Sequence, residues 1–170
     1  MRTLIPLVGL FFAIFCAAVV DAQTLQGHWR FDDLSGTTAA DSSGFGRDGS
    51  IGTGVTLGHP GAPGFGTSFR FDGTTGTSNG VVNVGNAPWG QNPLLNDMTV
   101  SAWINPESLG GVRRIWGIDG PGPGAPDNAG WGYGLLGDDL RFTTFGVLDY
   151  NIPVPGGIST DEWTHIAVTL

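Results

Sequence analysis

Residues 98–106 read MTVSAWINP, and they carry the clearest structural signal in the chain. Every second residue is apolar, and in a β-strand these side chains would share one face: Met98, Val100, Ala102 and Ile104. Thr99, Ser101 and Trp103 would occupy the other face, and Asn105-Pro106 ends the strand. The alternation returns in residues 161–170, DEWTHIAVTL, where Ile166, Val168 and Leu170 share a face. Both segments predict half-buried strands.

Other short segments rich in β-branched and aromatic residues recur along the chain, each closed by turn residues. We expect strands at residues 25–31, 66–71, 81–84, 112–118, 131–136, 140–145 and 163–170. In the second of these, Phe69 and Phe71 should point inward. Glycine is too frequent, and Lys, Glu and Gln are too scarce, for a convincing amphipathic helix. The sequence therefore predicts an all-β fold, an antiparallel two-sheet β-sandwich with long loops.

The N-terminus has the features of a cleavable signal peptide. Arg2 supplies a positive charge, residues 4–20 are an apolar run, and Val20-Asp21-Ala22 offers small residues at a cleavage site. The alternative is a membrane anchor, but the run is short for a bilayer span and contains Pro6 and Gly9. We expect residues 1–22 to be removed, residues 23–170 to form one domain, and no membrane insertion after cleavage.

The charge excludes several kinds of partner. All seven basic side chains are arginines, and the formal net charge is −8. Nucleic acids and anionic lipids require a basic face, so neither is an expected partner. The only cysteine lies in the predicted signal peptide, so the mature chain has no disulfide. An acidic, exported chain of this kind is expected to be secreted or held at the cell surface.

The acidic residues do not form a recognisable catalytic pair. Retaining glycosidases need two carboxyl groups about 5–5.5 Å apart, one with a raised pKa. The only glutamates, Glu107 and Glu162, are far apart in sequence. The neighbours Asp32-Asp33 and Asp138-Asp139 would point to opposite faces of a strand. The histidines also lack the spacing of a metalloprotease motif. We therefore expect no enzymatic activity.

Residues 41–49, DSSGFGRDG, concentrate oxygen atoms in a glycine-rich loop. Such a loop suits Ca²⁺, which takes 6–8 oxygen ligands, and Asp41 would be the metal ligand. Phe45 breaks the EF-hand pattern, however. The favoured alternative is an Asx turn, in which the Asp41 carboxylate accepts backbone hydrogen bonds.

Aromatic side chains are the candidates for a sugar-binding surface, because their faces pack on the C–H face of a pyranose. Trp131 and Tyr133 share a strand face and follow the Pro/Gly-rich stretch at residues 117–130. Nearby aromatic and polar residues complete the candidate ligand site: Trp116, Asp119, Asp127 and Asn128. Trp89 and Trp103 are further candidates. The alternative is that these rings fill the core, as we expect for Trp29 and Trp163.

Four segments in order, GHWRFDDLSGTTAADSSGFGRDGSI, SFRFDGTTGTSNGVVNVG, MTVSAWINP and DEWTHIAVTL, resemble the laminin-G-like jelly rolls of the concanavalin A-like lectin/glucanase superfamily. This resemblance implies a two-sheet jelly roll whose members bind carbohydrate or protein ligands, some with a Ca²⁺. It also implies a hairpin and a last strand beyond Leu170, so that the C-terminal strands are missing here. In the hydrolases of the superfamily, the resemblance implies catalytic carboxyl groups in a Glu-x-Asp-x-x-Glu run along one strand. This chain lacks such a run.

Together these observations predict an exported, non-catalytic ligand-binding module whose partner is a polysaccharide or glycan. The alternative is a protein-interaction or structural module at the cell surface, within a larger polypeptide and with an extracellular protein as partner. A glycoside hydrolase is the least favoured alternative.

Overall fold

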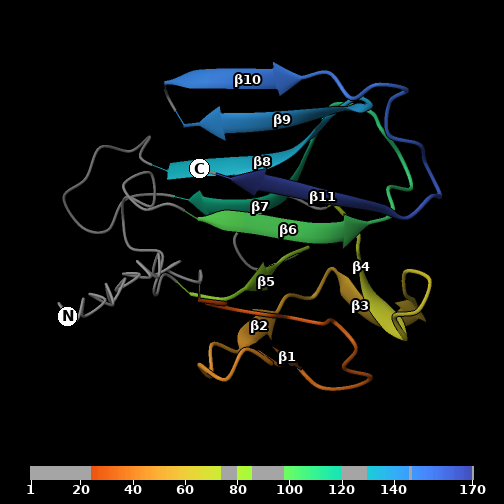
Figure 1. Ribbon diagram of the computed structural model, residues 1–170. Coiled ribbons are helices and arrows are strands. Elements are labelled where there is room, and N and C mark those ends of the chain that lie inside the picture. The colour runs from red at the N-terminus through yellow and green to blue at the C-terminus, as the bar shows by residue number, and fades with distance from the viewer. Residues whose placement is uncertain (1–23, 74–79, 86–97, 120–129, 146, 170) are drawn as a thin grey trace, which may run out of the picture.

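The computed structural model describes residues 24–73, 80–85, 98–119, 130–145 and 147–169 (Figure 1). These residues form eleven short strands and no helix, and every strand pair is antiparallel. The prediction of an all-β fold is confirmed. No helix in this part of the chain could cross a membrane. The predicted signal peptide at residues 1–22 lies outside the described residues.

The two segments with the clearest alternation pair with each other. Strand β6 (Thr99–Ile104) lies antiparallel to β11 (Thr164–Thr169), with Trp103 opposite His165 and Ala102 opposite Ile166. Val100, Ala102 and Ile104 are half-buried, whereas their neighbours along β6 are exposed. The predicted faces of both strands are therefore confirmed for the described residues.

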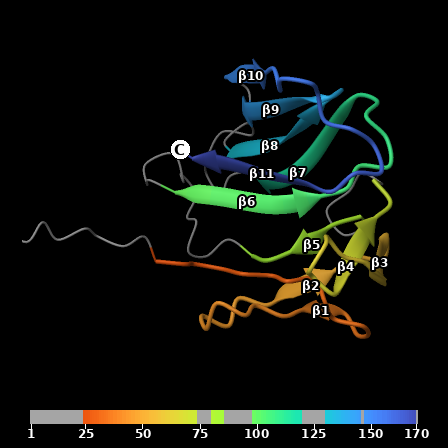
Figure 2. The same cartoon turned by 45° about the vertical axis from the view of Figure 1, so that its right-hand side comes forward.

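A four-stranded sheet forms the opposing layer, in the order β10-β9-β8-β7 (Figures 1 and 2). Its strands follow one another along the chain: β7 (Val112–Asp119), β8 (Gly130–Leu136), β9 (Asp139–Thr144) and β10 (Leu148–Ile152). The pairing of β7 with β8 shifts register between Arg114 and Trp116. The predictions at 112–118, 131–136 and 140–145 are confirmed, and β10 was not predicted.

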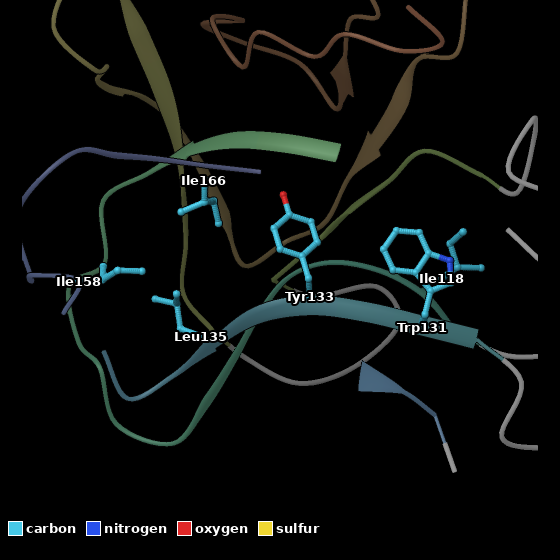
Figure 3. Close-up of a cluster of buried hydrophobic side chains, with 6 residues drawn as sticks. All are labelled: Ile118, Trp131, Tyr133, Leu135, Ile158 and Ile166. Atoms are coloured by element: carbon cyan, nitrogen blue, oxygen red, sulfur yellow. The ribbon is translucent and has the colours of Figure 1, made fainter. Parts of the chain in front are cut away.

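The main core lies between this sheet and the β6–β11 pair (Figure 3). Its buried side chains are Ile118, Trp131, Tyr133, Leu135, Ile158 and Ile166. On β8 the large residues alternate with glycines, so the opposite face carries no side chain at Gly132 and Gly134. A Cβ on Gly134 would lie 2.8 Å from the Cα of Arg114, so β7 can approach only because that position is glycine.

The N-terminal half contributes two smaller sheets. One has the order β1-β2-β5, from β1 (Thr38–Ala39), β2 (Gly49–Ile51) and β5 (Val82–Asn83). The other pairs β3 (Val55–Pro60) with β4 (Thr67–Phe71). A second buried cluster, Ala39, Val55 and Phe69, joins them. The rings of Trp29 and Trp116 lie 5.7 Å apart, which brings this half against β7.

Three local predictions differ from the structure. Residues 25–31 form no strand; they make only an isolated bridge between Trp29 and Asp41. Phe31 has a φ of 58°, which breaks an extended backbone, although its ring stacks on Phe69 at 4.8 Å. Phe71 is exposed rather than inward, because the sheet ends beside it. Finally, the described strands form four hydrogen-bonded sheets instead of two.

Candidate functional site

The aromatic residues first expected to bind ligand belong to the core. Trp131 is 0 % exposed and Tyr133 is 4 % exposed, so neither ring can stack on a sugar, and both follow the alternative that these rings fill the core. The physical reason is the position of β8. It lies between β7 and β9, and three of its large side chains, Trp131, Tyr133 and Leu135, belong to the main core together with Ile166 of β11. Trp116 is half-buried opposite Tyr133 and packs against the same core.

The polar residues of the predicted ligand site are only partly placed. Asp119 is the last residue of β7 and pairs with Gly130, but its side chain is not among the described features. Asp127 and Asn128 lie outside the described residues. The structure therefore does not bring the predicted set together in the part of the chain that it describes.

Asp41 organises the loop at residues 41–49. Its Oδ1 accepts hydrogen bonds from the backbone N–H groups of His28 and Ser43, both at 2.9 Å. Its Oδ2 accepts the Ser43 hydroxyl at 2.7 Å and the Arg47 N–H at 3.0 Å. The N–H of Asp41 in turn donates to Asp48 Oδ1 at 2.8 Å. The carboxylate thus fastens its own loop to the chain before β1.

These contacts set the charge state of Asp41. Desolvation of the carboxylate raises its pKa, but the hydrogen bonds from His28, Arg47 and Ser43 together outweigh that effect. The net result is a pKa well below the usual range, so the group is an anion at neutral pH.

The same contacts bear on Ca²⁺. Donors occupy both oxygens of Asp41, and their hydrogens point to where a cation would bind. Among the described residues, no group of three or more His, Cys, Asp or Glu side chains is placed to hold a metal ion. The residues around Asp41 therefore do not fit a Ca²⁺ site, and the geometry is that of the Asx turn. Binding of Ca²⁺ itself stays a prediction for titration.

An exposed group of rings lies on the outer face of the β6–β11 pair. Trp103 is 45 % exposed, and its ring centroid lies 5.3 Å from that of His165, its cross-strand partner. Phe65, which is 58 % exposed, also contacts Trp103, with the two ring centroids 5.9 Å apart. We call Trp103, His165 and Phe65 the Trp103 surface.

The loop between β3 and β4 delivers Phe65 to this surface. Within the loop, the N–H of Phe65 donates to the Ala62 carbonyl at 2.8 Å. Farther along β4, Arg70 makes a two-pronged ion pair with Glu107, at 2.5 and 2.8 Å, just beyond the end of β6. This pair ties the hairpin to the strand that carries Trp103. The hydrogen bond from Arg70 lowers the pKa of Glu107, and the positive charges nearby lower it further.

Small polar side chains continue the face beside the rings. Ser101 lies opposite Ala167, and Thr99 lies opposite Thr169, with their hydroxyls 3.0 Å apart. All four of these side chains are exposed. The Trp103 surface is therefore an apolar platform that opens onto hydroxyl groups along the same two strands.

Part of the Trp103 surface could be predicted from the sequence. The alternation placed Trp103 on the polar face of its strand, and a tryptophan among polar residues is a usable signal. Aligning the two alternating segments would also have suggested His165 as a neighbour. Phe65 was missed, because its approach to Trp103 depends on how a separate hairpin packs, which no local pattern records.

The comparison with known families matches the part of the chain that contains Trp103 and His165. A laminin-G-type family model (Laminin_G_3), described as the concanavalin A-like lectin/glucanases superfamily, matches residues 75–170. No curated protein and no solved structure gave a match. The matched residues make up more than half of the chain and include β6 to β11, with the main core and the strands of the Trp103 surface. The chain therefore belongs to the concanavalin A-like lectin/glucanase superfamily, as a laminin-G-like domain.

Proposed function

We propose that this chain is an exported, non-catalytic module that binds carbohydrate through the Trp103 surface. The observation that supports it most strongly is the exposed indole of Trp103 on an otherwise polar sheet face, with the rings of Phe65 and His165 beside it. Exposed aromatic rings that gather on one face mark a binding site more often than rings scattered singly.

The chemistry of the surface suits a sugar. A pyranose ring has an apolar C–H face, which packs on an indole or phenyl ring, and an equatorial rim of hydroxyls. Ser101 on β6 and His165 on β11 can exchange hydrogen bonds with such hydroxyls beside the ring of Trp103. A polysaccharide lying along the strands would contact both the apolar and the polar part of this face.

The described carboxylates support a binding role over hydrolysis. A glycosidase acid must keep its proton near neutral pH, which requires a raised pKa. The hydrogen bond from Arg70 lowers the pKa of Glu107, and the hydrogen bonds from Thr143 and Arg141 lower that of Asp149. The pKa of Asp41 is lowered as well. The carboxyl groups with a clear shift therefore move in the direction opposite to that of a catalytic acid.

Export and the jelly-roll fold are part of the same proposal. The signal-peptide features of residues 1–22 support export, so that the mature module is secreted or held at the cell surface. The face-to-face layers around the main core support a two-sheet jelly roll.

The test compares Trp103→Ala with the unmutated protein on a glycan and polysaccharide array, followed by calorimetry with each glycan that binds. We expect binding to weaken about tenfold or more, which corresponds to roughly 1.4 kcal/mol. Phe45→Ala is the matched control, because Phe45 is an exposed ring in the separate Asp41 loop. This control should bind as the unmutated protein does.

Equal binding by Trp103→Ala would contradict the proposed site. An array with no bound glycan would contradict the proposed ligand and favour the alternative, a protein-interaction module.

A further inference from the structure

Strand β10 forms an exposed edge of the four-stranded sheet. It pairs with β9 on one side, and no described strand pairs with its other side. Figures 1 and 2 both show it at the margin of the molecule. All five of its side chains are exposed. Its outward N–H and C=O groups are therefore available to another strand.

The edge lacks the usual features that prevent strand pairing. Natural edge strands carry lysines, prolines, bulges or unpaired charges. The chain contains no lysine, β10 contains no proline, and its register with β9 is regular from Leu148 to Ile152. The only charge is Asp149, which forms an ion pair with Arg141. The hydrogen bond from Thr143, followed by the contacts of Arg141, lowers the pKa of Asp149, so this charge is already compensated.

One face of the edge is apolar. Leu148, Tyr150 and Ile152 are 52 %, 49 % and 47 % exposed, and they lie opposite Thr144, Phe142 and Leu140 of β9. Phe142 and Leu140 pack against the main core, and the rings of Tyr150 and Phe142 lie 6.2 Å apart. The strip is thus an uncovered continuation of the core face.

The sequence of β10, Leu-Asp-Tyr-Asn-Ile, has the same polarity pattern in both directions. We propose that β10 pairs antiparallel with β10 of a second copy of this chain, about a two-fold axis through Tyr150. In this register Leu148 lies opposite the second copy's Ile152, and Asp149 opposite its Asn151. The six apolar residues then form one strip, and the two sheets become one continuous sheet.

The charges along β10 permit this occupant. Each chain carries a net charge of −8, so most of its surfaces repel a second copy. Along β10 the proposed register places each carboxylate opposite an amide, and no two carboxylates face each other. The repulsion between the rest of the two chains is screened by salt, so self-association should strengthen as ionic strength rises. This inference uses no residue of the Trp103 surface and stands independently of the proposed ligand.

The test replaces Asn151. A negative charge at this position would attract Arg141 within one chain but repel Asp149 of the second copy across the proposed interface. Asn151→Asp would place two carboxylates opposite Asp149 residues, one at each end of the symmetric pairing. We expect the dissociation constant to rise about two- to thirtyfold. Asn151→Lys should lower it by a similar factor. Within one chain, residue 151 lies opposite Arg141, so the Asp variant keeps a folded monomer.

Sedimentation equilibrium over a range of protein and salt concentrations gives the dissociation constants. Hydrogen exchange at the β10 amides, which should slow as protein concentration rises, locates the contact. Leu34→Lys is the control, since Leu34 is exposed in a separate loop and should leave self-association unchanged. If Asn151→Asp and Asn151→Lys shift the dissociation constant in the same direction, the proposed register is wrong. A chain that is monomeric at every concentration would overturn the proposal and leave a strand of another protein as the occupant of this edge.

Discussion

Tyr133→Phe tests whether the core contains a polar atom without a partner. The Tyr133 hydroxyl and the indole N–H of Trp131 are buried, and neither makes a hydrogen bond in the structure as described. Figure 3 shows both side chains projecting from β8 into the main core. Burial also raises the pKa of Tyr133 to about 12, as expected for a phenol removed from water.

The expected effect is a gain in stability. A buried donor without a partner costs about 1–3 kcal/mol, and Tyr133→Phe removes that cost while it keeps the ring in place. The small void left by the oxygen offsets part of the gain, so we expect about 1 kcal/mol in the free energy of unfolding. For a chain of this size the melting temperature should rise by about 2–4 °C.

Thermal and urea unfolding of the purified protein measure this difference. Tyr150→Phe is the matched control, measured at a protein concentration below that of the proposed self-association, because it removes the only other tyrosine hydroxyl from an exposed position and should change stability by less than about 0.5 kcal/mol. A loss of about 1 kcal/mol or more in Tyr133→Phe, with an unchanged control, would refute the reasoning and show that the hydroxyl has a partner.

Two further predictions concern the N-terminal half. Because its hydrogen bonds hold the pKa of Asp41 in the folded protein below the usual value for an aspartate, about 3.9, the contribution of Asp41 to stability is present above that pH and is lost as the pH falls below it. Asp41→Asn should therefore reduce the fall in melting temperature between about pH 4 and pH 2. The exposed control Asp161→Asn should follow the unmutated protein. Identical acid profiles for all three proteins would contradict the role of the Asx turn. N-terminal sequencing of exported protein should begin at Gln23, and an intact Met1 in the membrane fraction would contradict signal cleavage.

Much of the strand arrangement followed from local sequence. Period-two alternation identified β6 and β11 and assigned their faces, because successive side chains of a strand must point to opposite sides. The same rule placed Trp131 and Tyr133 on one face of β8. It missed β10, although Leu148, Tyr150 and Ile152 alternate with polar residues there, and it misassigned residues 25–31, where Phe31 takes a positive φ.

The sequence by itself determined which side chains share a face, but only the tertiary structure decided which faces are covered. Trp131 and Tyr133 are buried because the β6–β11 pair packs on their side of β8, and Trp103 is exposed because that core lies on the other side of its own strand. The Asp41 contact with His28 and the approach of Phe65 to Trp103 likewise join segments distant in the sequence. Alternation is a local property of the chain, whereas burial depends on which other segment arrives, and that is set by packing across the whole domain.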